Sequence, residues 1–423
     1  MLTCVPFSIL YDLENNLPLI FIFCSGITIS AGFLMRVATK KDKNSEIKKR
    51  DGYLIVVLGW LFMTIFGSLP YLLSGSIPTL TNAFFETMSG FTTTGSTILN
   101  DIESLPKSIL FWRSMTQWIG GMGIIVLTIA ILPLLGIGGM ELFIAEAPGP
   151  TKDKIHPRIK ETAKRLWIIY LGLTTLETIV LMFLGLDFFD AINHSLTTTS
   201  TGGFSTKQAS IAAFKNPCVE AVIVVFMFLA GTNFTLIYFG IKLKFKKIFN
   251  NDEFKWYITS LTMVVFALTF FHSYINHTTL LNSFRNISFQ VVSIITTTGF
   301  ATADYTTWGY FMTFIFFLFL FSGASAGSTS GGIKIVRIII LIKNSLLEFK
   351  RRLHPKAVIP VLLNGSAISN QIIYNLLAFI FLYLFIFTIG SIFLAALGLD
   401  FLTAISAVAS AVGNVGPGIA NVG

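Results

Sequence analysis

Four short clusters of threonine, serine and glycine interrupt a chain that is otherwise dominated by long apolar blocks. They lie at roughly even intervals, at residues 92–96, 197–203, 296–300 and 412–416. Non-helical backbone survives at membrane depth only where it is buried in protein or lines a watery cavity. The recurrence of such clusters therefore predicts one pore assembled from four internal repeats.

The composition predicts a polytopic membrane protein. Hydrophobic residues make up 53% of the 423 residues and charged residues only 12%, and the apolar residues fall in blocks of membrane-spanning length. The formal net charge of +9 comes from Lys and Arg gathered between the blocks, which a membrane orientation signal explains better than nucleic-acid binding. Cys4, Cys24 and Cys218 lack paired spacing, so neither a disulfide framework nor a thiolate metal site is expected.

The apolar blocks divide into long spans and short helices. We predict short helices, each ending at a cluster, at residues 80–91, 188–196, 281–295 and 400–411. We predict long spans at residues 17–37, 53–73, 108–137, 166–186, 218–241, 256–274, 310–342 and 374–397. Basic residues gather at 36–50, 152–165, 242–247 and 343–356, which the positive-inside rule places in the cytoplasm. All four clusters then fall on the outer side.

This layout predicts an all-α polytopic membrane protein in which span, pore helix, filter and span recur four times around a pseudo-fourfold pore. We expect N-terminal extra spans and a cytoplasmic basic loop at 1–50, followed by repeats at 51–150, 151–250, 251–356 and 357–423. The third repeat is expected to carry an intramembrane gate loop. The given chain is expected to be incomplete, because the last repeat lacks a final helix.

The clusters have the chemistry to strip water from a monovalent cation. Backbone carbonyls and threonine hydroxyls supply several oxygens at once, and the absence of acidic residues argues against a divalent-cation ring. We predict that Gly95, Gly202 and Gly299 orient the carbonyls of the first three filters; in the fourth, Gly413 is favoured over Asn414. Tight packing of small residues between helices is the alternative interpretation. The predicted filter residues are Thr93, Thr94, Gly95, Ser200, Thr201, Gly202, Thr297, Thr298, Gly299, Val412, Gly413 and Asn414.

A second glycine-rich segment lies inside the predicted span at 310–342. No side chain from Ser322 to Gly332 is larger than threonine, so this span is expected to break into two halves around a mobile loop. Its position below the third filter suits a gate, whereas Lys334 could equally mark the return to the cytoplasm. The predicted gate-loop residues are Gly323, Gly327, Gly331, Gly332 and Lys334.

Four stretches carry a resemblance to a known family. They read SGFTTTGST at 89–97, WRSMTQWIGGMG at 112–123, STGGFST at 200–206 and TTTGFATADY at 296–305. The sequence resembles the Trk/Ktr/HKT superfamily of potassium transporters, and within it the bacterial TrkH branch. The resemblance implies potassium uptake across the bacterial cytoplasmic membrane, with K⁺ in the filter and an obstructing loop in repeat 3. It also implies a homodimer controlled by a cytoplasmic, nucleotide-binding TrkA-type subunit.

Two other function classes remain for comparison. A sodium-coupled or other secondary transporter for a different solute can also be built from broken helices, but it predicts inverted repeats and binding residues at the midplane. An enzyme is not expected, because the sequence shows no paired carboxylate, Ser/His or metal-ligand pattern.

Overall fold

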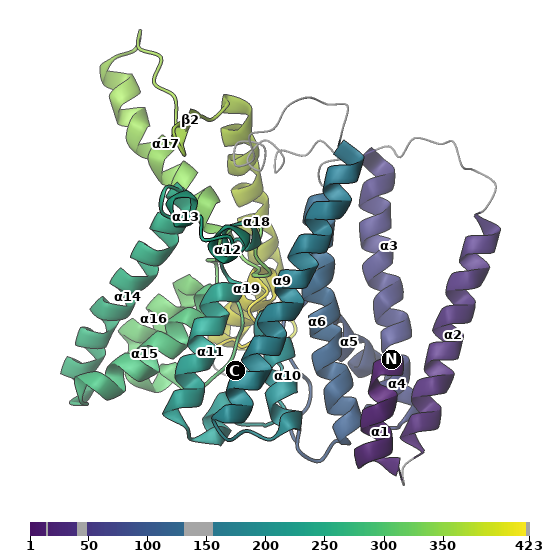
Figure 1. Ribbon diagram of the computed structural model, residues 1–423. Helices are drawn as coiled ribbons and strands as arrows, with labels where there is room; N and C mark the ends of the chain where they lie inside the picture. Colours follow the sequence, from purple (N-terminus) through teal and green to yellow (C-terminus); the bar gives the residue numbers. More distant parts are fainter. Residues whose placement is uncertain (14–15, 40–48, 131–154, 420–423) are drawn as a thin grey trace.

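The computed structural model describes residues 1–13, 16–39, 49–130 and 155–419, and these are almost entirely helical (Figure 1). Among these residues, five helices are long and apolar enough to cross a membrane, or six if one bent pair counts as a single span. The predicted all-α polytopic class is confirmed. Most of the first predicted basic loop and the start of the second lie outside the described residues.

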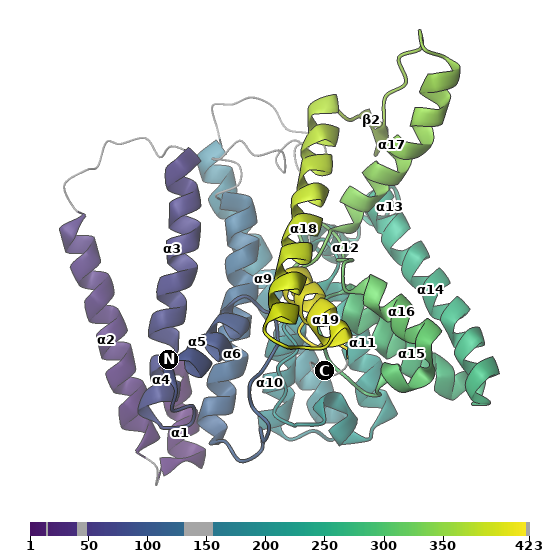
Figure 2. The same cartoon turned by 180° about the vertical axis from the view of Figure 1, so that it is seen from behind.

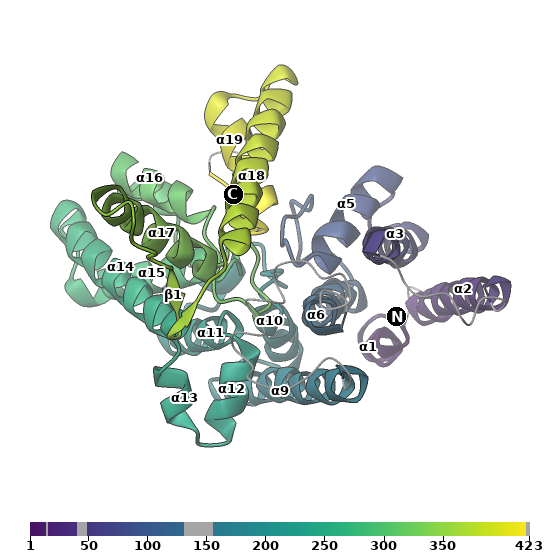
Figure 3. The same ribbon diagram turned by 90° about the horizontal axis from the view of Figure 1, so that it is seen from above.

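The N-terminal helices lie at the periphery. A 3₁₀ turn, Leu2–Cys4, leads into α1 (Val5–Tyr11), and α2 (Leu17–Ala38) follows. Seen from above, α1 and α2 stand outside the other helices, which are grouped around a common centre (Figure 3). The bounds of α2 agree with those of the predicted first span, 17–37, to within one residue.

One order of elements recurs through the rest of the chain: a long helix, a short helix, an extended segment and a further helix. The long helices are α3 (Lys49–Gly67) with α4 (Leu69–Leu73), α9 (Ile155–Phe183), α14 (Asp252–Asn276) and α18 (Asn370–Ala396). The short helices are α5 (Leu80–Phe91), α10 (Phe188–Thr199), α15 (Leu280–Ile295) and α19 (Phe401–Gly413). The further helices are α6 (Lys107–Ala130), α11 (Pro217–Ala230) with α12 (Phe234–Ile241), and α16 (Tyr310–Phe319) with α17 (Ile335–Leu353).

Local sequence explains where the short helices begin and end. The side chains of Asp187, Thr279 and Asp400 cap α10, α15 and α19 by accepting a hydrogen bond from a backbone N–H of the first turn. At the other end, runs of threonine and glycine disfavour further helix. Figure 2 shows α19 lying against the long helix α18. The four short helices are separate elements, and residues at their C-terminal ends are buried.

Many threonines and serines are buried, and many large apolar residues on the long helices face outward, unlike the surface of a water-soluble protein. The last turn of α10 buries Thr197, Thr198 and Thr199, whereas α18 exposes Phe381 and Phe393 by more than half of their surface. Exposed apolar faces on long helices suit contact with lipid. The same arrangement reserves the centre of the assembly for hydroxyl and backbone groups.

The predicted span at 218–241 is broken in the structure. The structure breaks it into α11 and α12, which are bent by 107° at residues 231–233. Asn233 starts the second half, because its side chain accepts a hydrogen bond from the N–H of Thr235 at 2.8 Å. The freed backbone groups are taken up by residues 320–334: Ser325 N donates to Gly231 O at 3.0 Å and Phe234 N donates to Gly327 O at 3.1 Å.

The predicted break in the span at 310–342 is confirmed. Helix α16 ends at Phe319 and α17 begins at Ile335, and the backbones of Ser322 and Ile333 form a parallel bridge that draws the ends of the loop together. We call residues 320–334 the repeat-3 loop. Helix α17 then projects beyond the rest of the assembly (Figures 1 and 2), carrying Lys350, Arg351 and Arg352 in its last turn. A small hairpin of β1 (Leu362–Leu363) and β2 (Ser366–Ala367) and the short α13 (Phe245–Phe249) lie at the same end.

Candidate functional site

The four short helices end in the same backbone turn. In the first, Thr93 takes a left-handed conformation with φ of 60°, its N–H donates to Gly90 O at 3.0 Å, and the N–H of Thr94 donates to Ser89 O at 2.9 Å. This is the Schellman pattern of helix termination. The left-handed residues in the other three turns, with the same pair of hydrogen bonds, are Thr201, Thr297 and Asn414. A non-glycine residue in this region is uncommon, so its recurrence at four helix ends marks equivalent positions.

A glycine with positive φ follows each left-handed residue two positions later. These glycines are Gly95 (φ 84°), Gly203 (76°), Gly299 (82°) and Gly416 (103°). The two markers define four equivalent stretches, which we call ring segments 1 to 4. They are Thr93 to Gly95, Thr201 to Gly203, Thr297 to Gly299 and Asn414 to Gly416.

The ring segments contact one another in a closed cyclic order. A Cβ atom added to the glycine of one segment would lie within 3.0 Å of a main-chain oxygen in the next. That oxygen always belongs to the residue preceding the next glycine. The contacts run from Gly95 to Gly202, from Gly203 to Thr298, from Gly299 to Val415, and from Gly416 back to Thr94. Four segments far apart in the sequence thus form one closed ring.

The structure corrects the register that the sequence predicted for two of these segments. In repeat 2 the left-handed glycine is Gly203, so the predicted set Ser200, Thr201 and Gly202 is displaced by one residue. In repeat 4 it is Gly416, and the predicted Gly413 is instead the last residue of α19. The predicted triplets of repeats 1 and 3 coincide with ring segments 1 and 3. The filter role of all these residues stays a prediction.

Asn414 joins the last ring segment to the first. Its Oδ1 accepts a hydrogen bond from Thr94 Oγ1 at 2.5 Å, and its Nδ2 donates to Thr92 O at 2.9 Å. Ser96 Oγ adds a third link by donating to Gly416 O at 2.9 Å. The other three segments carry threonine at the position of Asn414, so this amide is specific to the contact between segments 4 and 1.

Two buried side chains of α6 hold ring segment 2 in place. Gln117 Nε2 donates to Gly202 O at 2.7 Å, while Gln117 Oε1 accepts from Phe204 N at 3.0 Å. Arg113 Nε pairs with Glu86 Oε1 of α5 at 2.9 Å, and Arg113 also donates to Ser205 O at 3.2 Å. Arg113 and Gln117 lie in the 112–123 motif, but the sequence assigned them no role, although both are polar residues within an apolar span.

The ring favours a cation without carrying a charge of its own. None of its twelve residues is acidic or basic. The C-terminal ends of α5, α10, α15 and α19 all terminate at the ring, and a helix C-terminus carries about half a negative charge. The nearby acids engage local groups: Asp190 Oδ1 accepts from Thr206 Oγ1 at 2.6 Å, and Asp304 Oδ1 accepts from Thr306 N at 2.8 Å.

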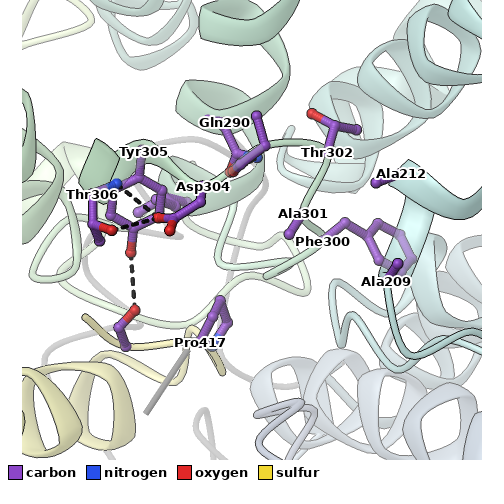
Figure 4. Close-up of a pocket in the computed structure, with 13 residues that line it drawn as sticks. Ala209, Ala212, Gln290, Phe300, Ala301, Thr302, Asp304, Tyr305, Thr306 and Pro417 are labelled. Atoms are coloured by element: carbon purple, nitrogen blue, oxygen red, sulfur yellow. Dashed lines mark hydrogen bonds between the residues drawn. The ribbon is translucent and has the colours of Figure 1, made fainter. Parts of the chain in front are cut away.

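A cavity of about 480 Å³ opens beside ring segments 3 and 4 (Figure 4). Its wall includes Phe300, Asp304 and Pro417. Tyr305 forms part of the same wall and donates its hydroxyl hydrogen to Gly418 O at 3.1 Å, which ties the stretch after segment 3 to the stretch after segment 4. The cavity is thus lined by the residues that directly follow segments 3 and 4.

The repeat-3 loop packs against the ring. Gly331 N donates to Thr297 Oγ1 at 2.6 Å, and a Cβ atom on Gly331 would lie 2.6 Å from Gly413 O. Thr329 Oγ1 lies 3.2 Å from Thr199 O and 3.3 Å from Ala230 O. The loop thereby touches the last residue of α10, the last residue of α19 and ring segment 3, which follows α15. Its predicted place below the third filter stays a prediction.

Lys334 turns back onto the repeat-3 loop. Its Nζ contacts Ser330 O, lies 2.9 Å from Ser330 Oγ and 3.5 Å from Ser328 Oγ. Gly323 and Gly332 lie against each other at the mouth of the loop, where a side chain on either would meet backbone. The five predicted gate-loop residues thus lie in one compact structure, and their role stays a prediction.

Comparison with known proteins identifies the family. Residues 20–421 match the TrkH family, described as cation transport protein. The chain belongs to the TrkH family. The resemblance seen in the sequence motifs is thereby confirmed, and the chain is a multi-pass protein of the cytoplasmic membrane.

Individual TrkH relatives match over most of their length. The Trk system potassium uptake protein TrkH of Escherichia coli is 41% identical over 399 residues, which cover 93% of this chain and 82% of the relative. The protein of the same name from Vibrio parahaemolyticus is 40% identical over 432 residues, which cover 100% and 88%. The crystal structure of the potassium transporter TrkH from Vibrio parahaemolyticus superposes with a TM-score of 0.90 at 36% identity, covering 100% of this chain and 87% of that one.

Proposed function

We propose that this TrkH-family protein takes up potassium across the cytoplasmic membrane through the ring formed by segments 1 to 4. The closed cyclic contact of the four segments carries the proposal, because it brings backbone and hydroxyl oxygens from four repeats to one place. A cation that loses its water needs several oxygens at once, and uncharged oxygens bind it without trapping it. The names of the relatives, Trk system potassium uptake proteins, support potassium as the ion.

The corrected register changes which residues we propose for the filter. In place of Ser200, Val412 and Gly413, the proposed filter takes Gly203, Val415 and Gly416. The full set is Thr93, Thr94, Gly95, Thr201, Gly202, Gly203, Thr297, Thr298, Gly299, Asn414, Val415 and Gly416. Their glycines let neighbouring segments approach closely, and the helix C-termini behind them favour positive charge.

We further propose that the repeat-3 loop is the gate. Its contacts with the ends of α10 and α19 and with ring segment 3 support an obstruction immediately beside the ring. A partner subunit of the Trk system would act on this loop from the cytoplasmic side, where α13 and α17 lie with their basic residues. We propose that this partner is a nucleotide-binding TrkA-type protein and that the transporter acts as a homodimer.

Potassium uptake by the full-length protein tests the function. Expressed in a bacterium that lacks its own potassium uptake systems, it is expected to restore growth at limiting potassium. The Gly299→Ser variant is expected to admit more sodium, because its added side chain disturbs the contact with segment 4. Wild-type protein that reaches the membrane but leaves uptake at background would overturn the proposal. Potassium-independent uptake of another solute would favour the secondary-transporter alternative.

The Thr329→Val variant is expected to loosen the proposed gate. The substitution removes the hydroxyl that holds the loop to Thr199 O and Ala230 O, at a cost of about 1 kcal/mol for a hydrogen bond. We expect uptake to rise by roughly tenfold at most, measured as initial rate of rubidium influx. Thr388→Val is the control, because Thr388 lies exposed on α18. Unchanged or slower influx at equal protein levels would count against the gate.

A further inference from the structure

We infer that Glu177 is a neutral carboxylic acid that holds a proton inside the membrane domain, directly behind ring segment 2. Glu177 lies on α9 and is fully buried. Neither of its carboxyl oxygens has a hydrogen-bond partner among the residues that the structure describes. An unpaired buried carboxylate would be very costly, so the group needs either a counter-charge or a proton.

The surroundings place Glu177 against the helix that carries ring segment 2. On the same face of α9, one turn earlier, Thr174 Oγ1 lies 3.2 Å from Thr199 Oγ1, the last residue of α10. The side chain of Thr198, also on α10, lies beside Glu177. Thr199 directly precedes Ser200 and ring segment 2, so the carboxyl group sits one turn of α10 away from the proposed filter.

The threonine hydroxyls near Glu177 donate to backbone carbonyls in the structure rather than to the carboxyl group. Thr198 Oγ1 donates its single hydrogen to His194 O at 2.7 Å, and Thr178 Oγ1 donates to Thr174 O at 2.8 Å. Thr174 Oγ1 likewise has acceptors in Tyr170 O and Thr199 Oγ1. A carboxylate only accepts, whereas a protonated carboxyl group has an O–H to donate. The environment therefore suits the protonated form.

Among the side chains that the structure describes, no printed contact brings a positive charge to Glu177. The elements packed against α9 are α6, α10, α11 and α12, and the charged groups in them engage other partners or lie at the helix ends. Arg113 pairs with Glu86, Glu220 pairs with Arg285, and His194 bonds to Asp190 O and Ser205 Oγ. The remaining titratable groups on α9 and on these elements, within the described residues, are Lys107, His156, Arg158, Lys160, Glu161, Lys164, Arg165, Tyr170, Asp190, Cys218, Tyr238 and Lys242. The C-terminal end of α10 adds partial negative charge, which further disfavours ionisation.

The inferred proton makes uptake sensitive to alkaline pH, a consequence that rests on the proposed function. While protonated, Glu177 adds no charge beside the last turn of α10. As pH rises and the proton is lost, a negative charge appears behind segment 2 and disturbs the ring. We therefore expect potassium uptake to fall with rising pH once Glu177 ionises.

Infrared spectroscopy tests the proton without relying on transport. Full-length protein in lipid at neutral pH is expected to show the carbonyl stretch of a protonated, buried carboxylic acid. This band should disappear in Glu177→Gln and remain in Glu161→Gln, an exposed glutamate on the same helix. A wild-type spectrum without a protonated carboxyl band, or a band unaffected by Glu177→Gln, would overturn the inference. If Glu177→Gln does not fold, the pH titration of the wild-type band decides instead, because a band already lost at neutral pH contradicts the inference.

Rubidium influx as a function of pH tests the consequence. Wild-type influx is expected to fall about tenfold per pH unit above the ionisation midpoint of Glu177, whereas Glu177→Gln influx should stay level over the same range. Parallel curves for the two proteins would contradict a functional role for the proton. A wild-type protein without influx at any pH would instead refute the proposed function, and the infrared result would still decide the state of Glu177.

Discussion

Replacement of Gly416 by alanine is expected to reduce potassium uptake by roughly a hundredfold. Gly416 has φ of 103°, and its added Cβ would lie 2.5 Å from Thr94 O, the contact that closes the ring between segments 4 and 1. Left-handed strain contributes about 1–2 kcal/mol and the clash with backbone about as much again. A total near 3 kcal/mol corresponds to about a hundredfold loss of the closed ring. Initial rubidium influx at matched membrane expression measures the effect.

Gly398→Ala is the matched control for backbone strain. Gly398 has φ of 95°, close to that of Gly416, but an added Cβ would meet nothing within 4 Å. This variant is expected to keep most of the uptake, because it introduces strain without touching the ring. Equal losses in the two variants would mean that strain alone explains the effect, and the ring contact would lose its support.

Replacement of Arg113 by alanine is expected to lower the free energy of unfolding by about 3–5 kcal/mol. Arg113 is 1% exposed and Glu86 is 0% exposed, so the substitution leaves a buried carboxylate without its cation. It also removes donors to Ser205 O and Thr97 Oγ1, which hold the stretches that follow ring segments 1 and 2. Thermal or denaturant unfolding of purified protein in detergent measures the loss.

The exposed pair on α9 provides the control for Arg113. Arg165 pairs with Glu161 at 3.5 Å, with more than half of each side chain exposed, so Arg165→Ala should cost well under 1 kcal/mol. The double variant Glu86→Leu with Arg113→Met should recover part of the stability, since it removes the unpaired charge. If Arg113→Ala were as mild as Arg165→Ala, the pair would not anchor the ring.

The sequence predicted most of the fold, because membrane burial imposes strong local rules. Long apolar runs predicted most of the long helices, and the helix over 80–91 was predicted with its observed bounds. The break at the repeat-3 loop was also predicted, since eleven consecutive small residues cannot form a stable lipid-facing helix. The long helices and the break in the repeat-3 loop are set by composition over many residues, so an error in one or two positions does not change their prediction.

The details of the ring depend on contacts between distant segments, which a local pattern does not reveal. Within residues 201–203, both Gly202 and Gly203 could be the glycine that faces the next segment. The contact with Thr298 O assigns this position to Gly203. In repeat 4, Asn414 takes the position of the threonines in the other segments and so concealed the equivalence of Gly416. The break between α11 and α12 was missed for a related reason: Gly231 and Asn233 are single small and polar residues, and their partners lie in the repeat-3 loop.

The location of the bound ion is the most direct test of the claim that segments 1 to 4 form the potassium filter. Crystals of the full-length protein grown with rubidium in place of potassium should show anomalous scattering from rubidium inside the ring of segments 1 to 4, with oxygens from all four segments around it. Rubidium bound elsewhere among the membrane-spanning helices, with none inside the ring, would contradict the assignment of these segments as the potassium filter.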